Sequence, residues 1–168
     1  MTTIQTFEQL IIAAQSAGPK RVALVAADQW EALEAAGLGH TRGLAEFVLI
    51  GDAERIEALL AESGFNLGFP EIVNESSPRR AAQRGVDLAR SGAVDLIMNG
   101  RVQPGHLVRT ANDPATGLRS AGRLMTDVAA FEIPGVDRLV FVADILLAVN
   151  PPLEEKADIV QNAIDVAL

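Results

Sequence analysis

Short apolar segments alternate with longer amphipathic segments four times within the first hundred residues of the chain. The short segments are rich in Val, Ile and Leu, and they span residues 20–27, 45–52, 70–75 and 93–100. Continuous apolar runs of this length are typical of strands that are buried on both faces of a sheet. When such strands alternate with helices, right-handed crossovers bring the strands into one mostly parallel sheet. The pattern therefore predicts a three-layer α/β fold.

The amphipathic segments before and between the predicted strands begin with residues that favour helix N-termini. Four short polar residues stand where these helices would begin: Thr6, Asp28, Asp52 and Ser77. Such side chains accept hydrogen bonds from the first backbone N–H groups of a helix, so we predict that they are N-caps. Pro78 directly after Ser77 suits the first helical position, where no N–H group is needed.

The pattern changes after residue 117. Two apolar runs, 124–133 and 137–147, are separated by only three residues, PGV. This link is too short for a helical crossover, so we predict that the two runs pair as antiparallel strands. A closing helix follows a double proline at 151–152. Since 168 residues suit one compact domain, we predict a single α/β domain, 1–168, whose mostly parallel sheet is accompanied by an antiparallel strand pair.

Charge and composition exclude several classes of function. The formal net charge of -8 argues against a nucleic-acid-binding protein, which needs a broad basic face. Cysteine is absent, so disulfides, thiolate metal sites and a cysteine nucleophile are excluded. The two histidines, His40 and His106, have no second ligand at metal-binding spacing, so no metal is expected. We see no signal peptide and no apolar run near the roughly 20 residues that span a bilayer, and we expect a cytoplasmic protein.

Positive charge gathers in one stretch of this acidic chain. Arg101, Arg109, Arg119 and Arg123 are accompanied by a single intervening carboxylate, Asp113. The stretch begins where the fourth predicted strand ends, and ligands of open α/β sheets bind beyond the carboxyl ends of strands. A helix predicted to start near residue 104 would add free N–H groups, which suit an anion, and arginine matches phosphate oxygens in pairs. The alternative is that these arginines form an ordinary solvated face.

Nucleotide-binding loops of known type are absent from the sequence. Neither GxxxxGK[ST] nor a GxGxxG motif after the first strand occurs.

Five short motifs follow one another between residues 94 and 167. They are Met98-Asn99-Gly100, Gly117-Leu118-Arg119, an apolar strand that ends at Asp144, the run NPPL at 150–153 with Lys156, and a helix that contains DIVQNA at 158–163. In this order they resemble the phosphate acetyl/butyryl transferase family. The resemblance is clearest over residues 94 to 167, whereas residues 1 to 93 match the family mainly in the order of their elements.

The resemblance implies an enzyme that exchanges acyl-CoA and phosphate with acyl phosphate and CoA. It implies that CoA is a substrate and that no cofactor is needed. It also implies half of a fold like that of isocitrate and isopropylmalate dehydrogenases, whose active site lies between two domains. The CoA thiolate would attack the acyl carbonyl directly, which agrees with the absence of cysteine. With this resemblance in view, we take Asn99, Gly100, Arg109, Arg119 and Asp144 as candidate substrate-binding residues.

The sequence departs from the family pattern in two ways that affect the predicted function. Members commonly have Lys where Asn99 stands, and Ser-His where Thr126 and Asp127 stand. Members are also about twice as long, and this chain corresponds to their first half, so the usual catalytic residues have no counterpart here. We therefore assign no catalytic residue and leave the acyl chain length open.

Three hypotheses follow for the function. The first is a phosphate acetyl- or butyryltransferase. The second is a non-catalytic CoA- or phosphate-binding or oligomer-assembly domain that descends from that family. The third is an unrelated α/β module with ordinary surface arginines. A first half would leave apolar surface uncovered, so we expect a homo-oligomer or a partner subunit that supplies the missing half, with residues 137–149 as a candidate interface.

Overall fold

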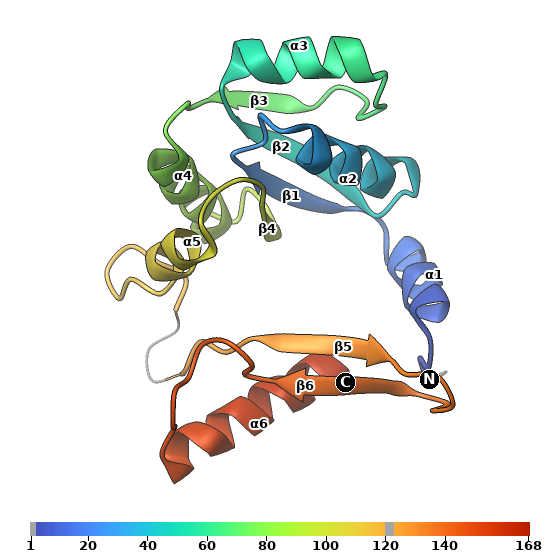
Figure 1. Cartoon of the computed structure of the whole chain (residues 1–168), viewed down its shortest axis with the longest axis vertical. Coiled ribbons are helices and arrows are strands. Elements are labelled where there is room, and N and C mark those ends of the chain that lie inside the picture. Colours follow the sequence, from blue (N-terminus) through green and yellow to red (C-terminus); the bar gives the residue numbers. More distant parts are fainter. Residues whose placement is uncertain (1–2, 120–122) are drawn as a thin grey trace. The chain divides into compact units, whose positions relative to one another are not determined.

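The computed structural model describes residues 3–119 and 123–168 of the chain (Figure 1). The chain divides into two compact units. One unit is Ala14–Leu118, and the other consists of Met1–Ala13 together with Arg119–Leu168. Each unit is described separately below, and the single domain 1–168 stays a prediction.

The unit Ala14–Leu118 is built on a four-stranded parallel sheet. Its strands are β1 (Lys20–Val25), β2 (Ala45–Gly51), β3 (Glu71–Asn74) and β4 (Leu96–Asn99). They lie in the order β3-β2-β1-β4, and every neighbouring pair is parallel. The mostly parallel sheet predicted from the alternating apolar segments is thus confirmed, because each of the four predicted segments contains one of these strands.

Helices cover both faces of this sheet (Figure 1). The helices are α2 (Trp30–Thr41), α3 (Ala53–Ser63), α4 (Pro78–Arg90) and α5 (Pro104–Ala111). Leu24 and Leu49 point to the face packed by α2 and α3, whereas Val25 and Ile50 point to the face packed by α4 and α5. Because successive side chains of a strand point to opposite faces, continuous apolar strands supply a core on each side.

The predicted helix starts agree with the structure at three of four positions. Thr6 Oγ1 accepts from Gln9 N at 3.2 Å, and Asp52 Oδ1 accepts from Arg55 N at 3.1 Å. Ser77 is the N-cap residue of α4, although its side chain makes no capping hydrogen bond. The prediction for Asp28 is wrong: Gln29 occupies the N-cap of α2, because the chain makes one more tight turn after β1, with Gln29 N donating to Ala27 O at 2.7 Å.

The second unit contains an antiparallel strand pair and a helix (Figure 1). Strand β5 (Val128–Glu132) pairs with β6 (Leu139–Ala143), so the predicted antiparallel arrangement is confirmed. Helix α6 (Leu153–Ala167) contacts both strands, and it begins directly after the double proline. Helix α1 (Phe7–Ala17) begins in this unit, where Phe7 N donates to Glu132 Oε2 at 3.1 Å.

No helix in the described part of the chain is both long enough and apolar enough to cross a membrane.

Candidate anion-binding site

The carboxyl ends of β1 and β4 lie side by side, with Val25 opposite Asn99. From β1 the chain proceeds to β2 and β3 on one side, and it then returns to place β4 on the other side of β1. Ligands of open α/β sheets bind at such a reversal of strand order. A cavity of about 320 Å³ opens at this point, between the start of α2 and the residues that follow β4.

Gly100 allows the chain to leave β4 close to the end of β1. Gly100 N donates to Val25 O at 2.8 Å. A Cβ atom at this position would lie 2.7 Å from the same carbonyl oxygen and still closer to Ala26 O. Ala26 itself has a φ of 53°, which is uncommon for a residue with a side chain. Only glycine fits at position 100 without displacement of this backbone.

Asn99 lines the cavity with one hydrogen-bonding atom still available. Its Nδ2 donates to Val102 O at 2.9 Å, which holds the loop that enters α5. Its Oδ1 is buried and accepts no hydrogen bond from any residue that the structure describes. A buried acceptor without a partner is costly, and an N–H or O–H donor, not a phosphate oxygen, would satisfy it.

Arg101 lies in the same cavity, where Nη1 is 3.4 Å from Gln29 Oε1. Arg109 lies elsewhere, in the last turn of α5. The start of α5 at Pro104 and the position of Arg109 on that helix agree with the prediction, and a phosphate site made of Arg109 and the first turn of α5 stays a prediction. Arg109 follows Pro104 by five residues, about 7.5 Å along the helix at 1.5 Å per residue, so it lies beyond the first turn.

Arg109 instead faces the start of α4 across a second cavity of about 430 Å³. The lining residues come from the first turns of α4 and from α5: Ser77, Arg79, Arg80, Gln83, His106, Arg109 and Thr110. The first N–H groups of a helix have no intrahelical partner, and neither a Ser77 side-chain cap nor an acidic residue of the first turn compensates them here. The Glu75 carboxylate, just before the helix, accepts from the N–H group of Ser77 at 2.9 Å. We call this group of residues the α4 pocket.

The α4 pocket carries uncompensated positive charge. Arg80 is the exception, because its Nε contacts Glu75 Oε2 at 2.9 Å. That hydrogen bond, together with the one from Ser77 N, lowers the pKa of Glu75, and the same partner raises the pKa of Arg80. Arg79 and Arg109 make no ion pair with any residue that the structure describes. Two free guanidinium groups beside a helix N-terminus suit a phosphate or another multivalent anion.

The sequence analysis missed Arg79 and Arg80 as site residues. The signal was present in the run SPRR at 77–80, where two arginines follow the start of a helix. Their proximity to Arg109, however, depends on how α4 packs against α5, and residue spacing does not show that packing.

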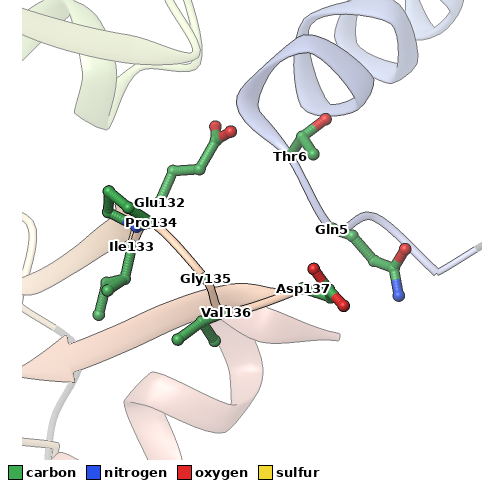
Figure 2. A pocket seen from close by; sticks show the side chains of 8 residues that line it. All are labelled: Gln5, Thr6, Glu132, Ile133, Pro134, Gly135, Val136 and Asp137. Atoms are coloured by element: carbon green, nitrogen blue, oxygen red, sulfur yellow. The ribbon is translucent and has the colours of Figure 1, made fainter.

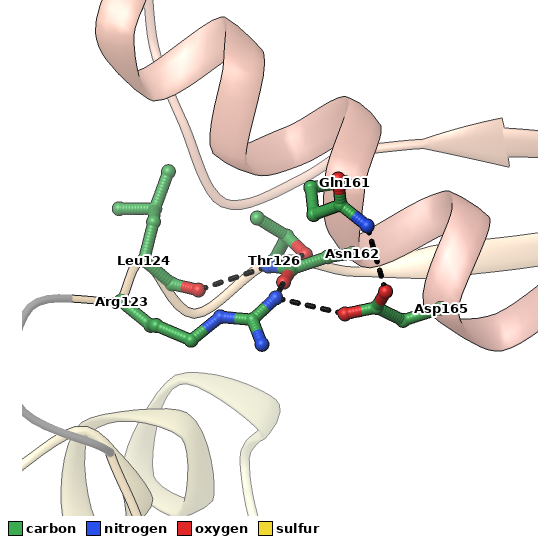
Figure 3. Close-up of polar contacts among 6 residues, drawn as sticks. All are labelled: Arg123, Leu124, Thr126, Gln161, Asn162 and Asp165. Atoms are coloured by element: carbon green, nitrogen blue, oxygen red, sulfur yellow. Dashed lines mark hydrogen bonds and ion pairs between the residues drawn. The ribbon is translucent and has the colours of Figure 1, made fainter.

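Arg119 and Arg123 belong to the other unit. Arg119 Nε donates to Arg123 O at 2.9 Å, and Arg123 forms an ion pair with Asp165 at 2.9 Å (Figure 3). Asn162 of α6 accepts from Arg123 and donates to Leu124 O at 3.0 Å (Figure 3). Arg123 therefore joins the segment that precedes β5 to α6. A site shared by Arg119 and Arg109 stays a prediction.

Asp144 lies at the end of β6 in an uncommon backbone conformation, with a φ of 56°. Its Oδ2 accepts from Ala148 N at 2.8 Å, while its Oδ1 is buried with no partner among the described residues. Asp127 accepts from Ile145 N and Leu146 N, each at 3.1 Å. Burial raises the pKa of Asp127, but hydrogen bonds from the N–H groups of Leu146 and Ile145 and with the Asp144 side chain together outweigh burial and hold the pKa below its ordinary value.

A further cavity of about 730 Å³ lies beside the turn between β5 and β6 (Figure 2). Its charged lining residues are Glu132 and Asp137, and no cationic side chain from the described residues lines it. This cavity is therefore unsuited to phosphate. In the part of the chain that the structure covers, no group of three or more His, Asp or Glu side chains is placed to hold a metal ion.

The curated proteins that resemble this chain are phosphate butyryltransferases and phosphate acetyltransferases. The chain is 35% identical over 164 residues to a phosphate butyryltransferase of Clostridium acetobutylicum, and this alignment covers 98% of the chain and 54% of the relative. It is 34% identical over 165 residues to a phosphate acetyltransferase of Rhizobium meliloti, with 95% of the chain and 50% of the relative covered. No family profile matches the chain. The chain thus spans about half the length of the curated relatives it matches.

Solved structures show the same fold. A phosphotransacetylase from Streptococcus pyogenes superimposes with a TM-score of 0.76 at 18% identity, over 92% of this chain and 56% of that chain. A branched-chain phosphotransacylase from Enterococcus faecalis gives a TM-score of 0.70 at 20% identity, over 88% of this chain and 51% of that chain.

Proposed function

Because this chain is a relative of the phosphate butyryltransferases and phosphate acetyltransferases over nearly its whole length, we propose that it takes part in phosphate acyl transfer. The reaction converts acyl-CoA and phosphate into acyl phosphate and CoA, and it is reversible. The observation that carries this proposal is the 35% identity to a phosphate butyryltransferase over 98% of the chain.

The chemistry needs no nucleophile from the protein. In the direction of acyl-CoA synthesis, the CoA thiolate attacks the acyl carbonyl carbon, a C–S bond forms, the bond from that carbon to the phosphate oxygen breaks, and phosphate leaves. The protein must hold both partners and stabilise the negative charge on the carbonyl oxygen and on the leaving phosphate. The free guanidinium groups of the α4 pocket supply charge of the required sign.

We assign the two cavities of the unit Ala14–Leu118 to different parts of the substrates. The α4 pocket would take a phosphate group, through Arg79, Arg109 and the N–H groups at the start of α4. The cavity at the end of β4 would take a hydrogen-bond donor, through Asn99, whose side chain would turn to present its Oδ1. The amide N–H groups of the pantetheine arm of CoA are donors of this kind. Gly100 would contribute to this cavity because its backbone lies close to the end of β1. We also propose that Arg119 and Asp144 bind substrate.

We further propose that residues 1–168 form one α/β domain that corresponds to the first half of an acyltransferase. The whole enzyme would then have the two-domain, dehydrogenase-like architecture, with its cleft completed by the part of the relatives that this chain does not match. We also propose that the chain assembles as a homo-oligomer or binds a partner subunit. A cytoplasmic location remains our expectation, since a cysteine-free chain fits a reducing compartment.

A thiol-release assay tests the proposed activity. Purified chain is mixed with phosphate and either acetyl-CoA or butyryl-CoA, and free CoA thiol is measured over time. We expect release above the rate without protein, and the Arg109→Ala variant should lower kcat/KM by about tenfold or more, since it removes one charge-assisted contact. Arg55→Ala is the matched control, because Arg55 lies on α3, which packs against the opposite face of the sheet.

If thiol is released no faster than without protein, but calorimetry shows that the chain binds CoA, the chain is a non-catalytic CoA-binding domain and not an enzyme. No release and no CoA binding would reject both of these functions.

A further inference from the structure

The α4 pocket contains a hydroxyl group that does not cap its helix. Ser77 lines the pocket and occupies the N-cap position of α4. A serine at that position ordinarily accepts a hydrogen bond from the first turn of the helix, but the side chain of Ser77 does not. Thr110, the other hydroxyl residue of the lining, is engaged, because its Oγ1 donates to His106 O at 2.9 Å. Ser77 Oγ is therefore the hydroxyl of this pocket that is available for chemistry.

The surroundings of this hydroxyl suit a phosphoryl group. Arg79 and Arg109 line the same cavity, and neither makes an ion pair with a residue that the structure describes. The nearest carboxylate in the sequence is Glu75, whose Oε2 contacts Arg80 Nε at 2.9 Å. Since Glu75 is neutralised by Arg80, the charges of Arg79 and Arg109 remain to attract an anion beside Ser77.

His106 can take the proton of this hydroxyl. The other lining side chains besides Ser77 are arginine, glutamine and threonine, which do not accept a proton near neutral pH. Both carboxylate oxygens of Glu75 already accept hydrogen bonds, Oε1 from Ser77 N and Oε2 from Arg80. The imidazole of His106 is the lining group suited to general base catalysis.

We propose that Ser77 is phosphorylated by an acyl phosphate bound in the α4 pocket. Ser77 Oγ attacks the phosphorus atom, a bond from this oxygen to phosphorus forms, and the bond from phosphorus to the acyl oxygen breaks. The acyl group leaves as a carboxylate, and the proton of the hydroxyl passes to His106 and then to water. The inference rests on the proposed function, because that proposal places the phosphate of the substrate in this pocket.

The phosphorylated chain would block its own pocket. A phosphoryl group on serine carries about -1.5 to -2 charges at pH 7, and on Ser77 it would stay beside Arg79 and Arg109 at the start of a helix. It would therefore exclude the phosphate group of the next substrate. In this way an accumulating acyl phosphate would switch off the site that binds it.

The experiment incubates the full 168-residue chain with acetyl phosphate or butyryl phosphate and follows the intact mass. We expect a single adduct of about 80 Da, the mass of a phosphoryl group, and peptide mapping should place it on Ser77. Ser77→Ala should give no adduct, whereas Ser77→Thr keeps a hydroxyl group and should still be labelled. His106→Gln should slow labelling by about a hundredfold or more, because it removes the general base.

Two controls separate a built site from the general reactivity of acyl phosphates. Ser76→Ala is the matched variant and should be labelled like the wild type, because Ser76 is exposed beside Ser77 but does not line the pocket. Chain unfolded in urea should not be labelled, because the pocket is lost. Circular dichroism verifies that each variant is folded. The labelled chain should gain no thermal stability from inorganic phosphate, in contrast to the unlabelled chain.

Several results would overturn the proposal. They are an unchanged mass, an acyl adduct in place of a phosphoryl adduct, a phosphoryl group on another residue, equal labelling of Ser77→Ala or of the unfolded chain, and a labelled chain that phosphate still stabilises. The thiol-release assay separates this inference from the proposed function. Labelling of Ser77 without thiol release supports the inference and rejects acyl transfer to CoA, whereas thiol release without labelling rejects the inference alone.

Discussion

At the residue scale, Gly100 fixes the path of the chain beside the cavity at the end of β4. We predict that Gly100→Ala lowers the free energy of unfolding by about 1–3 kcal/mol, because the added methyl group would press on the Val25 and Ala26 carbonyl oxygens. Urea denaturation measures this loss. Gly105→Ala is the control, since a methyl group added at this position of α5 would meet no described neighbour within 4 Å, and it should be neutral or stabilising. Equal effects of the two substitutions would contradict the packing argument.

Asp127 makes the stability of the chain depend on pH. Its pKa is lower in the folded protein than its ordinary value of 3.8, because hydrogen bonds from the N–H groups of Leu146 and Ile145 and with the Asp144 side chain together outweigh the effect of burial. The stabilisation is therefore complete above pH 3.8 and is lost as the pH falls through the folded-state pKa. We predict that Asp127→Asn destabilises at neutral pH, and that its difference from the wild type shrinks below pH 3.8. Urea midpoints of both proteins across this range provide the test, and a constant difference would refute the prediction.

At the scale of elements, α4 and α5 together create a positive site that neither helix has alone. We predict that inorganic phosphate binds this site and raises the melting temperature of the chain. At a phosphate concentration ten times the dissociation constant, the free energy of unfolding should rise by about 1.4 kcal/mol. Arg79→Glu should abolish the shift, because it places a carboxylate beside the helix start and Arg109. Arg84→Glu, on the same helix but outside the pocket lining, should keep the shift. Loss of the shift in both variants would indicate a general charge effect.

The elements themselves could be predicted from the sequence far better than the contacts between them. Strands β1 and β2 were evident because they are continuous apolar runs with caps and glycines around them. The antiparallel pairing of β5 with β6 followed from a link too short for a crossover. The α4 pocket could not be predicted, because Arg79 and Arg109 are far apart in the sequence and meet only through helix packing. The N-cap of α2 was predicted wrongly for a local reason. The chain makes a tight turn at Ala27, and no residue type in the sequence indicates that turn.

At the scale of the whole molecule, buried apolar contacts are distributed unequally between the two units. The unit Ala14–Leu118 holds all the buried side chains of the described chain, among them Leu24 and Leu49 at 0% exposure. Opening of a region costs less when it exposes little buried apolar surface. We predict that backbone amides of β5 and β6 exchange with solvent at least about a hundredfold faster than those of β1 and β2. Hydrogen exchange followed by mass spectrometry measures both, and comparable protection would show that the second unit has a core of its own.

Among the described residues, β5 and β6 pair only with each other, so the outer edge of each strand is unpaired there. Strand β6 reads LVFVA, a run of high β-propensity without charge or proline, and an unpaired edge of that kind is a template on which identical strands can stack. Uncovered, the segment is a nucleus for fibrils, and the lag time of fibril growth should shorten as the protein concentration rises. A polypeptide that paired with that edge would also protect the chain from self-templated assembly.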